Sequence, residues 1–284
     1  MNQTPRALAV HDISCVGRCS LTVALPILSA AGIECSVLPT AVLSTHTGGF
    51  TDYTYRDLTD DIPAIMRHWQ ALNLSFDGIY TGFLGSEEQL SMVSGLFDAF
   101  RSDKNCIVVD PVMADNGRLY PVFTQSFARG MAMLCAKADV IVPNMTEAAF
   151  LLGRPYEEGP YTEDYIRTLL VELSEMGPDT VVLTGVHFDR ESLGAAVYHR
   201  KTGETFFSFA PLYPGFFHGT GDVFASALTS ALLRGFDRKK AVDIAVSLTV
   251  GSIRRTAAVG TDPRFGVHFE AGLAEFSRIM AEGR

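Results

Sequence analysis

Short apolar segments alternate with longer segments of helical periodicity along most of the chain. A run of about four to eight apolar residues is typical of a strand buried on both faces, whereas apolar residues three and four positions apart indicate a helix with one buried face. We expect strands at 7–12, 33–39, within 76–82, and at 106–111, 138–144 and 179–185. We expect helices at 20–32, 60–72, 86–100, 125–136, 146–153 and 162–176, and a mostly helical C-terminal third.

Local signals support several of these boundaries. The helix at 86–100 starts with a serine and two glutamates, which suit an N-cap and a first helical turn. Pro63 falls in the first turn of the helix at 60–72. The helix at 20–32 ends at a glycine, Gly32. Segments 194–199 and 204–209 are expected to form a hairpin.

The alternation of strands and helices predicts an α/β fold with a central, mostly parallel sheet covered by helices on both faces. No internal repeat or linker divides the sequence, so we expect one domain over residues 1–284, with 157–161 as a surface loop. Ligands bind such sheets at the carboxyl ends of the strands. The polar residues expected at or just beyond these ends are Asp12, Thr81, Gly82, Asp110, Asn144 and Thr184.

Composition and charge narrow the function classes. Hydrophobic residues make up 47% of the chain and charged residues 19%, as in an ordinary globular protein. The formal net charge of −9 argues against nucleic acid or an anionic membrane as the main partner. The five cysteines form no CxxC pair and no zinc pattern, and no apolar segment approaches the ~20 residues of a membrane span. We expect a reduced, soluble, cytoplasmic protein without a signal peptide.

Three common catalytic patterns are absent from the sequence. It has no GxxxxGK[ST] loop and no GxGxxG after the first strand, which argues against a P-loop NTPase and a dinucleotide-dependent dehydrogenase. It also has no GxSxG segment, so a serine hydrolase has no candidate nucleophile.

The segment Gly219–Thr220–Gly221–Asp222 directly precedes an apolar stretch of helical spacing. Glycines allow successive N–H groups to point at one spot, and the helix dipole adds positive potential there. This arrangement would stabilise the charge on a transferring phosphoryl group, and Asp222 could take the proton from an attacking hydroxyl. The alternative is an ordinary helix start, because aspartate is favoured in a first turn. Taken alone, the four residues support the two interpretations about equally.

The expected N–H donors around Asp222 also bear on its chemistry. Hydrogen bonds to a carboxylate favour its ionised form, which would make Asp222 a weak base. We therefore expect it to orient the hydroxyl and to accept its proton late, in a reaction in which positioning dominates.

Two acidic motifs follow the strands at 106–111 and 138–144. Asn144-x-x-Glu147 is most simply a capping box, although Glu147 could instead hold Mg²⁺ near nucleotide phosphates, directly or through water. Asp110 follows a buried strand, where a carboxylate is costly unless it is paired, caps a helix or binds a cation. Asp115 is a weaker candidate, because it and Asn116-Gly117 could form only a turn.

The loop "STHTGG" (44–49) holds hydroxyls, a histidine and two glycines. It is a turn by default, but it would suit a small polar ligand, with Thr47 donating a hydrogen bond and Gly48 allowing close approach. For His46 we expect a solvated loop histidine. Asp12 and Ser14, placed after the first strand, could contact the same ligand or cap the next helix.

The order of these motifs along the chain resembles that of the ribokinase-like kinases. The resemblance rests on Asn144-x-x-Glu147, Thr184-Gly185 and Gly219-Thr220-Gly221-Asp222. Within that superfamily, the pyridoxal kinases have stretches similar to "SVLPTAVLSTHTGGF", "YTGFLGS", "VVDPVMADNG" and "VIVPNMTEAAFLLG". The resemblance covers nearly the whole chain and implies a single-domain, three-layer α/β/α fold.

The resemblance implies an ATP-dependent kinase that phosphorylates the 5′-hydroxymethyl group of pyridoxal, pyridoxine or pyridoxamine in vitamin B6 salvage. It implies that Asp222 is the base, and that Gly219, Thr220 and Gly221 form the anion hole. The ATP and Mg²⁺ residues would be Asp110, Val142, Asn144, Glu147 and Thr184, with Glu147 and Asp110 on the metal side. The vitamer would contact Asp12, Ser14, Thr47, Gly48, Phe83 and Asp222. A K⁺ ion near the anion hole and a homodimer are usual in such kinases.

The sequence departs from many pyridoxal kinases at two positions. Asp12 falls where a substrate-binding serine is frequent, and Phe83 falls where a tyrosine is frequent. An acid at position 12 could accept a hydrogen bond from the ring hydroxyl or the protonated ring nitrogen. These departures leave the preferred vitamer open.

Three alternatives to a pyridoxal kinase stay open. A hydroxymethylpyrimidine kinase would share the anion hole and the base, but "STHTGG" replaces the loop with Gln and Asn that is typical of those enzymes. A sugar kinase would carry a Gly-Gly-Asn segment near the N-terminus, which is missing here. A vitamer-binding module without activity would not need Asp222.

Overall fold

The structure, a computed structural model, describes residues 4–283. The chain divides into two compact units. One comprises the described residues up to Gly82 together with those from Tyr213 onward, and the other is Phe83–Leu212. The single domain expected from the sequence stays a prediction.

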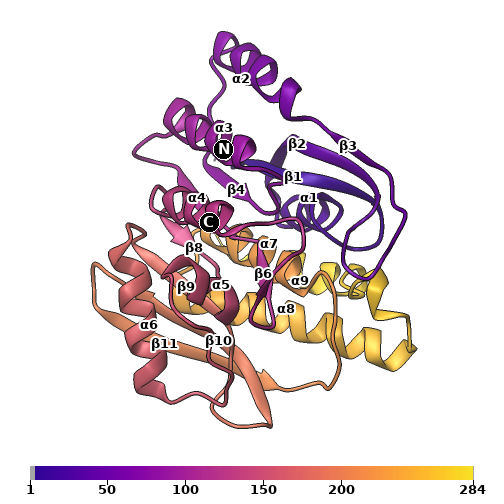
Figure 1. The fold of residues 1–284 in the computed structure, drawn as a ribbon. Helices are drawn as coiled ribbons and strands as arrows, with labels where there is room; N and C mark the ends of the chain where they lie inside the picture. The colour runs from indigo at the N-terminus through magenta and orange to yellow at the C-terminus, as the bar shows by residue number, and fades with distance from the viewer. Residues whose placement is uncertain (1–3, 284) are drawn as a thin grey trace. The chain divides into compact units, whose positions relative to one another are not determined.

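The first unit contains four strands in the order β4-β1-β2-β3 (Figure 1). They are β1 (Arg6–Val16), β2 (Glu34–Thr45), β3 (Tyr55–Asp57) and β4 (Gly78–Thr81). Strand β1 pairs in parallel with both β2 and β4, as the apolar segments predict, and β3 adds an antiparallel edge. The side chains of Leu8 and Val10 on β1 are completely buried.

Helices from both ends of the chain pack in this unit. They are α1 (Leu21–Ala30), α2 (Ile62–Ala71), α7 (Thr220–Leu233), α8 (Arg238–Val259) and α9 (Leu273–Met280). Helix α1 packs against β1 and α7, and α7 packs against β4 and α8 (Figure 1). Within residues 4–283, no helix combines the length and the apolar character needed to cross a membrane.

Strands β1 and β2 run further than their apolar segments predict. Their pairing continues to Val16 and Thr45, with a shift of register between His11 and Ile13. Asp12 lies at this irregularity, of the kind that often redirects side chains next to active sites. The expectation that Asp12 and Ser14 follow the strand is therefore wrong, because both lie within it.

The second unit contains five strands in the order β11-β10-β9-β8-β5. They are β5 (Cys106–Val109), β8 (Val140–Ile141), β9 (Thr180–Val186), β10 (Ser192–His199) and β11 (Glu204–Pro211). The first three of these along the chain are parallel, and β10 and β11 form the predicted hairpin. The apolar segment suggested that Thr184 lies at the end of a strand. In the structure β9 continues two residues beyond it, to Val186.

The helices of the second unit agree closely with their predicted limits. They are α3 (Glu87–Phe100), α4 (Gln125–Cys135), α5 (Met145–Leu151) and α6 (Glu163–Glu175). The Ser86 Oγ caps α3 by accepting the N–H of Gln89 at 3.1 Å. The Thr162 hydroxyl accepts the N–H of Tyr165 at 3.2 Å and caps α6 in the same way.

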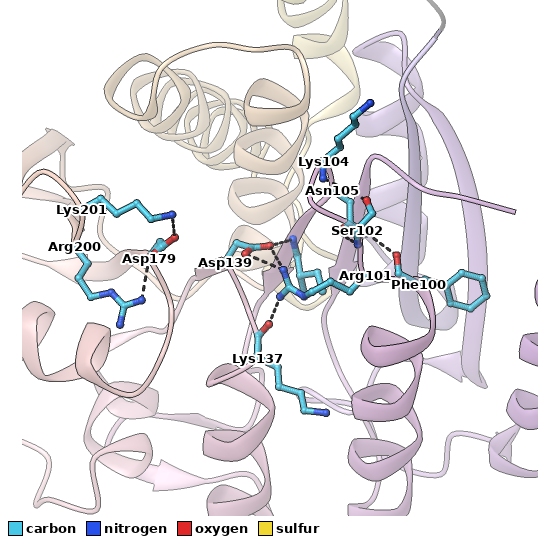
Figure 2. A network of polar contacts seen from close by, with 11 residues as sticks. Phe100, Arg101, Ser102, Lys104, Asn105, Lys137, Asp139, Asp179, Arg200 and Lys201 are labelled. Carbon is cyan, nitrogen blue, oxygen red and sulfur yellow. Dashed lines mark hydrogen bonds and ion pairs between the residues drawn. The ribbon is translucent and has the colours of Figure 1, made fainter.

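Strands β8 and β9 begin directly after two aspartates with cationic partners (Figure 2). Asp139 accepts hydrogen bonds of 3.0 and 3.1 Å from Nη1 of Arg101 and one of 2.7 Å from the N–H of Ile107. Asp179 is paired with Arg200 at 3.0 Å and also with Lys201. These ion pairs tie the amino-terminal ends of the strands to neighbouring segments.

Candidate active site

Gly219 is the N-cap of α7 and has φ 74° and ψ 3°, a left-handed conformation. A Cβ atom at this position would lie 2.0 Å from the Arg18 carbonyl oxygen, so no other residue fits without movement of the backbone. Glycine has no side chain with which to cap the helix, so the first N–H groups of α7 receive no acceptor from the N-cap residue. This local geometry matches the predicted anion hole better than a capped helix start.

Asp222 lies in the first turn of α7, near the Ser20 N–H. The pKa of Asp222 is raised to about 7, chiefly by burial and also by the charge of Asp12, while the Ser20 N–H lowers it. The expectation of a weak base is therefore wrong. That expectation rested on the N–H donors expected around Asp222, which lower its pKa. The loss of hydration on burial raises the pKa by more.

Asp12 is brought to the same place by β1. Its side chain is 4% exposed, and the Ser14 Oγ donates to the Asp12 Oδ2 at 2.9 Å. Burial raises the pKa of Asp12, against the hydrogen bonds from Ser20 and Ser14. The alternative that Asp12 or Ser14 caps the next helix is wrong, because the N-cap of α1 is Ser20 and no side-chain cap is formed there.

The loop after β2 is ordered around His46. This side chain is 8% exposed, which contradicts the expected solvated histidine. Its Nδ1 accepts the N–H of Gly48 at 3.0 Å, so its Nε2 is left to donate to the Arg264 carbonyl oxygen at 2.6 Å. A Cβ at Gly48 would lie 2.6 Å from the His218 ring, which explains the need for glycine, while Thr47 is exposed.

The sequence analysis missed two neighbours of the predicted anion hole. His218 directly precedes Gly219, and its ring centroid lies 5.0 Å from that of His46; its pKa is lowered by burial and by His46. The Cys19 Sγ lies 3.7 Å from the Cβ position of Gly219, and burial raises the pKa of this thiol well above its usual range. His218 could have been predicted as a site residue because it directly precedes the glycine motif in the sequence. Nothing in the sequence pointed to Cys19.

In the second unit, Asn144 and Glu147 form the capping box of α5. The Asn144 Oδ1 accepts the Glu147 N–H at 2.9 Å, and the Glu147 Oε2 accepts the Asn144 N–H at 2.8 Å. The cap predicted from the residue types is confirmed. The N–H of Thr184 donates to the Pro143 carbonyl oxygen at 2.9 Å, beside Asn144, so these predicted nucleotide residues lie together.

Glu147 is a buried carboxyl, 3% exposed, whose Oε1 also accepts the Met113 N–H at 3.2 Å. Burial raises the pKa of Glu147 to about 8, with a contribution from Asp115. Asp110 is 7% exposed, and both Glu147 and Asp110 raise the pKa of Cys135. Asp115 accepts the Asn116 N–H at 2.8 Å in the turn between β6 (Ala114–Asp115) and β7 (Arg118–Leu119), as its turn interpretation predicts.

These carboxyl groups fit a Mg²⁺ that keeps most of its water. Among residues 4–283, no group of three or more histidine, cysteine or acidic side chains could enclose a metal ion. Glu147 and Asp110 offer hard oxygen donors, and a nearby cation would favour the charged form that burial opposes in Glu147. A direct or water-mediated contact with a phosphate-bound Mg²⁺ is therefore chemically suitable.

The last two predicted residues are both in the second unit. The Val142 side chain is 4% exposed, and its N–H donates to the Val109 carbonyl oxygen at 3.0 Å. The half-buried Phe83 ring lies 5.5 Å from the Phe123 ring, centroid to centroid. Their contacts with nucleotide and vitamer stay predictions.

Comparison with known proteins identifies the family. A family model described as phosphomethylpyrimidine kinase matches residues 28–266. The chain belongs to this family. It is 38% identical to a protein described as a phosphomethylpyrimidine kinase of Bacteroides thetaiotaomicron, crystallised with pyridoxal; the match covers 99% of this chain and 97% of that protein, with a TM-score of 0.91.

Two named pyridoxal kinases are also similar over their whole lengths. That of Lactobacillus plantarum is 31% identical, with 99% of each chain covered and a TM-score of 0.89. Pyridoxal kinase PdxY of Granulibacter bethesdensis is 26% identical over 268 residues, which cover 89% of this chain and 91% of that protein. These matches confirm the resemblance to pyridoxal kinases and the predicted three-layer α/β fold class.

Proposed function

We propose that this protein is a pyridoxal kinase, which transfers the γ-phosphoryl group of ATP to the 5′-hydroxymethyl group of pyridoxal, pyridoxine or pyridoxamine. The observation that carries the proposal is the Asp222 carboxyl, with its pKa raised to about 7, in the first turn of the helix capped by Gly219. The similar Bacteroides protein crystallised with pyridoxal supports the choice of substrate.

Asp222 acts as the general base. A carboxyl whose pKa lies near neutral pH can be ionised in the free protein and still accept a proton from an alcohol with useful driving force. The backbone N–H groups of Gly219, Thr220 and Gly221 stabilise the charge on the transferring phosphoryl group, helped by the dipole of α7. Positioning supplies most of the rate enhancement in such reactions.

The vitamer contacts Asp12, Ser14, Thr47 and Gly48 in this proposal, with Phe83 stacking on the ring. Asp12, like Phe83, departs from the residue that is frequent in pyridoxal kinases, because a carboxylate only accepts a hydrogen bond where a serine could also donate one. The absence of a side chain at Gly48 leaves room for the His218 ring, which lies beside His46.

In this proposal ATP is bound by residues of the second unit, namely Asp110, Val142, Asn144, Glu147 and Thr184. Mg²⁺, when bound with ATP, supplies positive charge to the phosphate oxygens. Glu147 and Asp110 hold it directly or through its water. A K⁺ ion beside the anion hole and a homodimer are further parts of the proposal, and they rest on the resemblance alone. A cytoplasmic location is also proposed, and it rests on the cysteine pattern and the composition.

A substrate panel with Mg-ATP tests the proposal. Pyridoxal, pyridoxine, pyridoxamine and hydroxymethylpyrimidine are compared by measuring ADP release and the phosphorylated product. We expect turnover of at least one pyridine substrate, with kcat/KM above that for hydroxymethylpyrimidine. Turnover of hydroxymethylpyrimidine alone would assign the second candidate, which the family's description favours. Binding of a vitamer without turnover of any compound would leave a binding module.

A further inference from the structure

The short hairpin of β6 and β7 belongs to the second unit, and β6 packs beside α5 (Figure 1). The two residues of its turn, Asn116 and Gly117, both have positive φ, 49° and 76°. A turn of this kind matches the twist of the strands that it joins, and Asn-Gly is its preferred sequence. A Cβ at Gly117 would lie 2.9 Å from the Tyr156 ring, so the turn also lies close to a neighbouring side chain.

Two side chains at the start of α5 hold the base of this hairpin. The Glu147 Oε1 accepts the Met113 N–H at 3.2 Å, and the Asn144 Nδ2 donates to the Ala114 carbonyl oxygen at 2.9 Å. Asn144 and Glu147 are also the residues of the capping box, and both are assigned to ATP in the proposed function. Any movement of the hairpin therefore acts directly on the side chains of two proposed nucleotide residues.

Thr146, between these two residues in the sequence, holds the tip of the hairpin. Its hydroxyl oxygen accepts the Gly117 N–H at 3.0 Å, and its side chain is 2% exposed. Each strand of the hairpin is only two residues long. A hairpin of this size is not stable by itself in water, so its place on the unit depends on such contacts with α5.

We propose that Thr146 is a positioning residue, which fixes the tip of the β6–β7 hairpin and thereby keeps Asn144 and Glu147 oriented for the nucleotide. The proposal rests on the proposed function where it assigns these two residues to ATP. It depends on one contact, the hydrogen bond from Gly117 to the Thr146 hydroxyl. Loss of that contact is expected to weaken the binding of ATP and to leave the vitamer almost unaffected.

Two variants at position 146 test the hydroxyl. Thr146→Val keeps the branched shape but removes the acceptor, which leaves the Gly117 N–H without its partner. One hydrogen bond of this kind changes an equilibrium by up to about tenfold. We therefore expect KM for Mg-ATP to rise about five- to tenfold, with KM for the vitamer within about twofold of wild type.

Thr146→Ser is the conservative variant, because it keeps the hydroxyl and loses only a methyl group. We expect its KM for Mg-ATP to stay within about twofold of wild type. An unchanged KM for Mg-ATP in Thr146→Val, or an equal rise in both variants, would overturn the proposal.

Thr249→Val is the matched control. Thr249 is a buried threonine of α8, and its hydroxyl donates to the Ala245 carbonyl oxygen of the same helix at 2.8 Å. The substitution removes a buried hydroxyl that has no bond to the hairpin, so we expect wild-type KM values. A rise in KM for Mg-ATP equal to that of Thr146→Val would indicate a general effect of lost stability and would overturn the proposal.

Amide hydrogen exchange in the free protein tests the contact without turnover. The exchange rate of the Gly117 amide is measured by ¹⁵N NMR in wild type and in the three variants. We expect exchange at least about tenfold faster in Thr146→Val, and wild-type rates in Thr146→Ser and Thr249→Val. An unchanged rate in Thr146→Val would overturn the role of Thr146.

Binding of a non-hydrolysable ATP analogue with Mg²⁺, measured by calorimetry, keeps the test independent of the substrate. We expect Kd to rise about five- to tenfold in Thr146→Val and to stay unchanged in Thr249→Val. Equal Kd values for wild type and Thr146→Val would overturn the proposal. If the wild-type protein phosphorylates no vitamer, the proposed function fails, while exchange and calorimetry still decide the role of Thr146.

Discussion

In the first unit, Asp12 accepts a hydrogen bond from the Ser14 hydroxyl and Asp222 lies near the Ser20 N–H, whereas in the second unit Asp139 and Asp179 are each paired with basic side chains. For Asp179 the effect on the pKa is opposite to that for Asp12 and Asp222. Burial raises the pKa of Asp12 and Asp222, while Lys201 and Arg200 lower that of Asp179. All four aspartates lie in or beside a strand or in the first turn of a helix. Their positions in the fold therefore do not explain why their pKa values differ.

The comparison separates two uses of an aspartate. A cation-paired aspartate with an N–H partner, such as Asp139, ties two segments together and contributes to stability. A buried aspartate with only neutral donors loses hydration without a compensating charge, so it costs stability at neutral pH. Such a group is retained for what it does chemically, and a raised pKa beside an anion hole suits proton transfer.

Removing the charge of Asp222 gives the largest expected effect. It tests whether Asp222, unlike Asp139 and Asp179, serves catalysis. For Asp222→Asn we expect kcat to fall by about three to four orders of magnitude, because the amide cannot accept the proton. Vitamer binding, measured by calorimetry, should be largely retained, since the amide keeps the size and shape of the carboxyl group. Unchanged turnover would contradict the assignment of Asp222.

The pH profile sharpens the comparison through the coupling of the two acids. Asp222 must be ionised to act, so we expect kcat/KM to fall about tenfold per unit below about pH 7. The charge of Asp12 raises the pKa of Asp222, so Asp12→Asn should move this limb to lower pH. The same substrate is used for both proteins, which cancels its own titration. A limb that stays in place would show that the two carboxyl groups are not coupled.

At Asp139 the expected effect is on stability alone. Asp139→Asn keeps one acceptor oxygen but loses the charge that faces Arg101, so we expect the free energy of unfolding to fall by about 1–2 kcal/mol. Urea unfolding measures this loss, and kcat should match that of wild type. A large loss of turnover in a folded variant would argue against a purely structural Asp139.

Asp179 gives the smallest effect, because its partners are more exposed. The lowered pKa of Asp179 stabilises the fold above the unfolded value near 3.8, and this contribution is lost as the pH falls through the folded value. For Asp179→Asn we expect a loss of at most about 1 kcal/mol at pH 7, which shrinks in strong acid and in high salt. A loss that grows with salt would contradict an ion-pair origin.

The helices could be predicted from the sequence to within a few residues, because their start signals are local. Ser86 and Thr162 cap the helices that follow them, and both caps lie within three residues of their partners. The strands were harder. The second halves of β1 and β2 mix polar and apolar residues, and they extend because each pairs with the other, from Ser14 opposite Leu43 to Val16 opposite Thr45. That partnership joins segments about thirty residues apart.

The residue types of the candidate site could also be predicted, but not their electrostatics. The glycines at 219 and 48 could be found from their motifs, and the structure gives each a steric reason. The weak base expected at Asp222 and the solvated histidine expected at His46 were wrong, since both depend on burial by distant segments.

The central claim is that Asp222 is kept at the expense of stability, and thermal unfolding against pH tests it most directly. The raised pKa means that the Asp222 carboxyl favours the fold fully below about pH 3.8 and loses this contribution as the pH rises through about 7. Asp222→Asn should therefore be more stable than wild type at pH 8, by roughly 1–3 kcal/mol, and this gain should be smaller at pH 5 and disappear below about pH 3.8. Asp139→Asn, measured beside it, should be less stable at both pH values. An Asp222→Asn variant that is less stable than wild type at pH 8 would contradict the account.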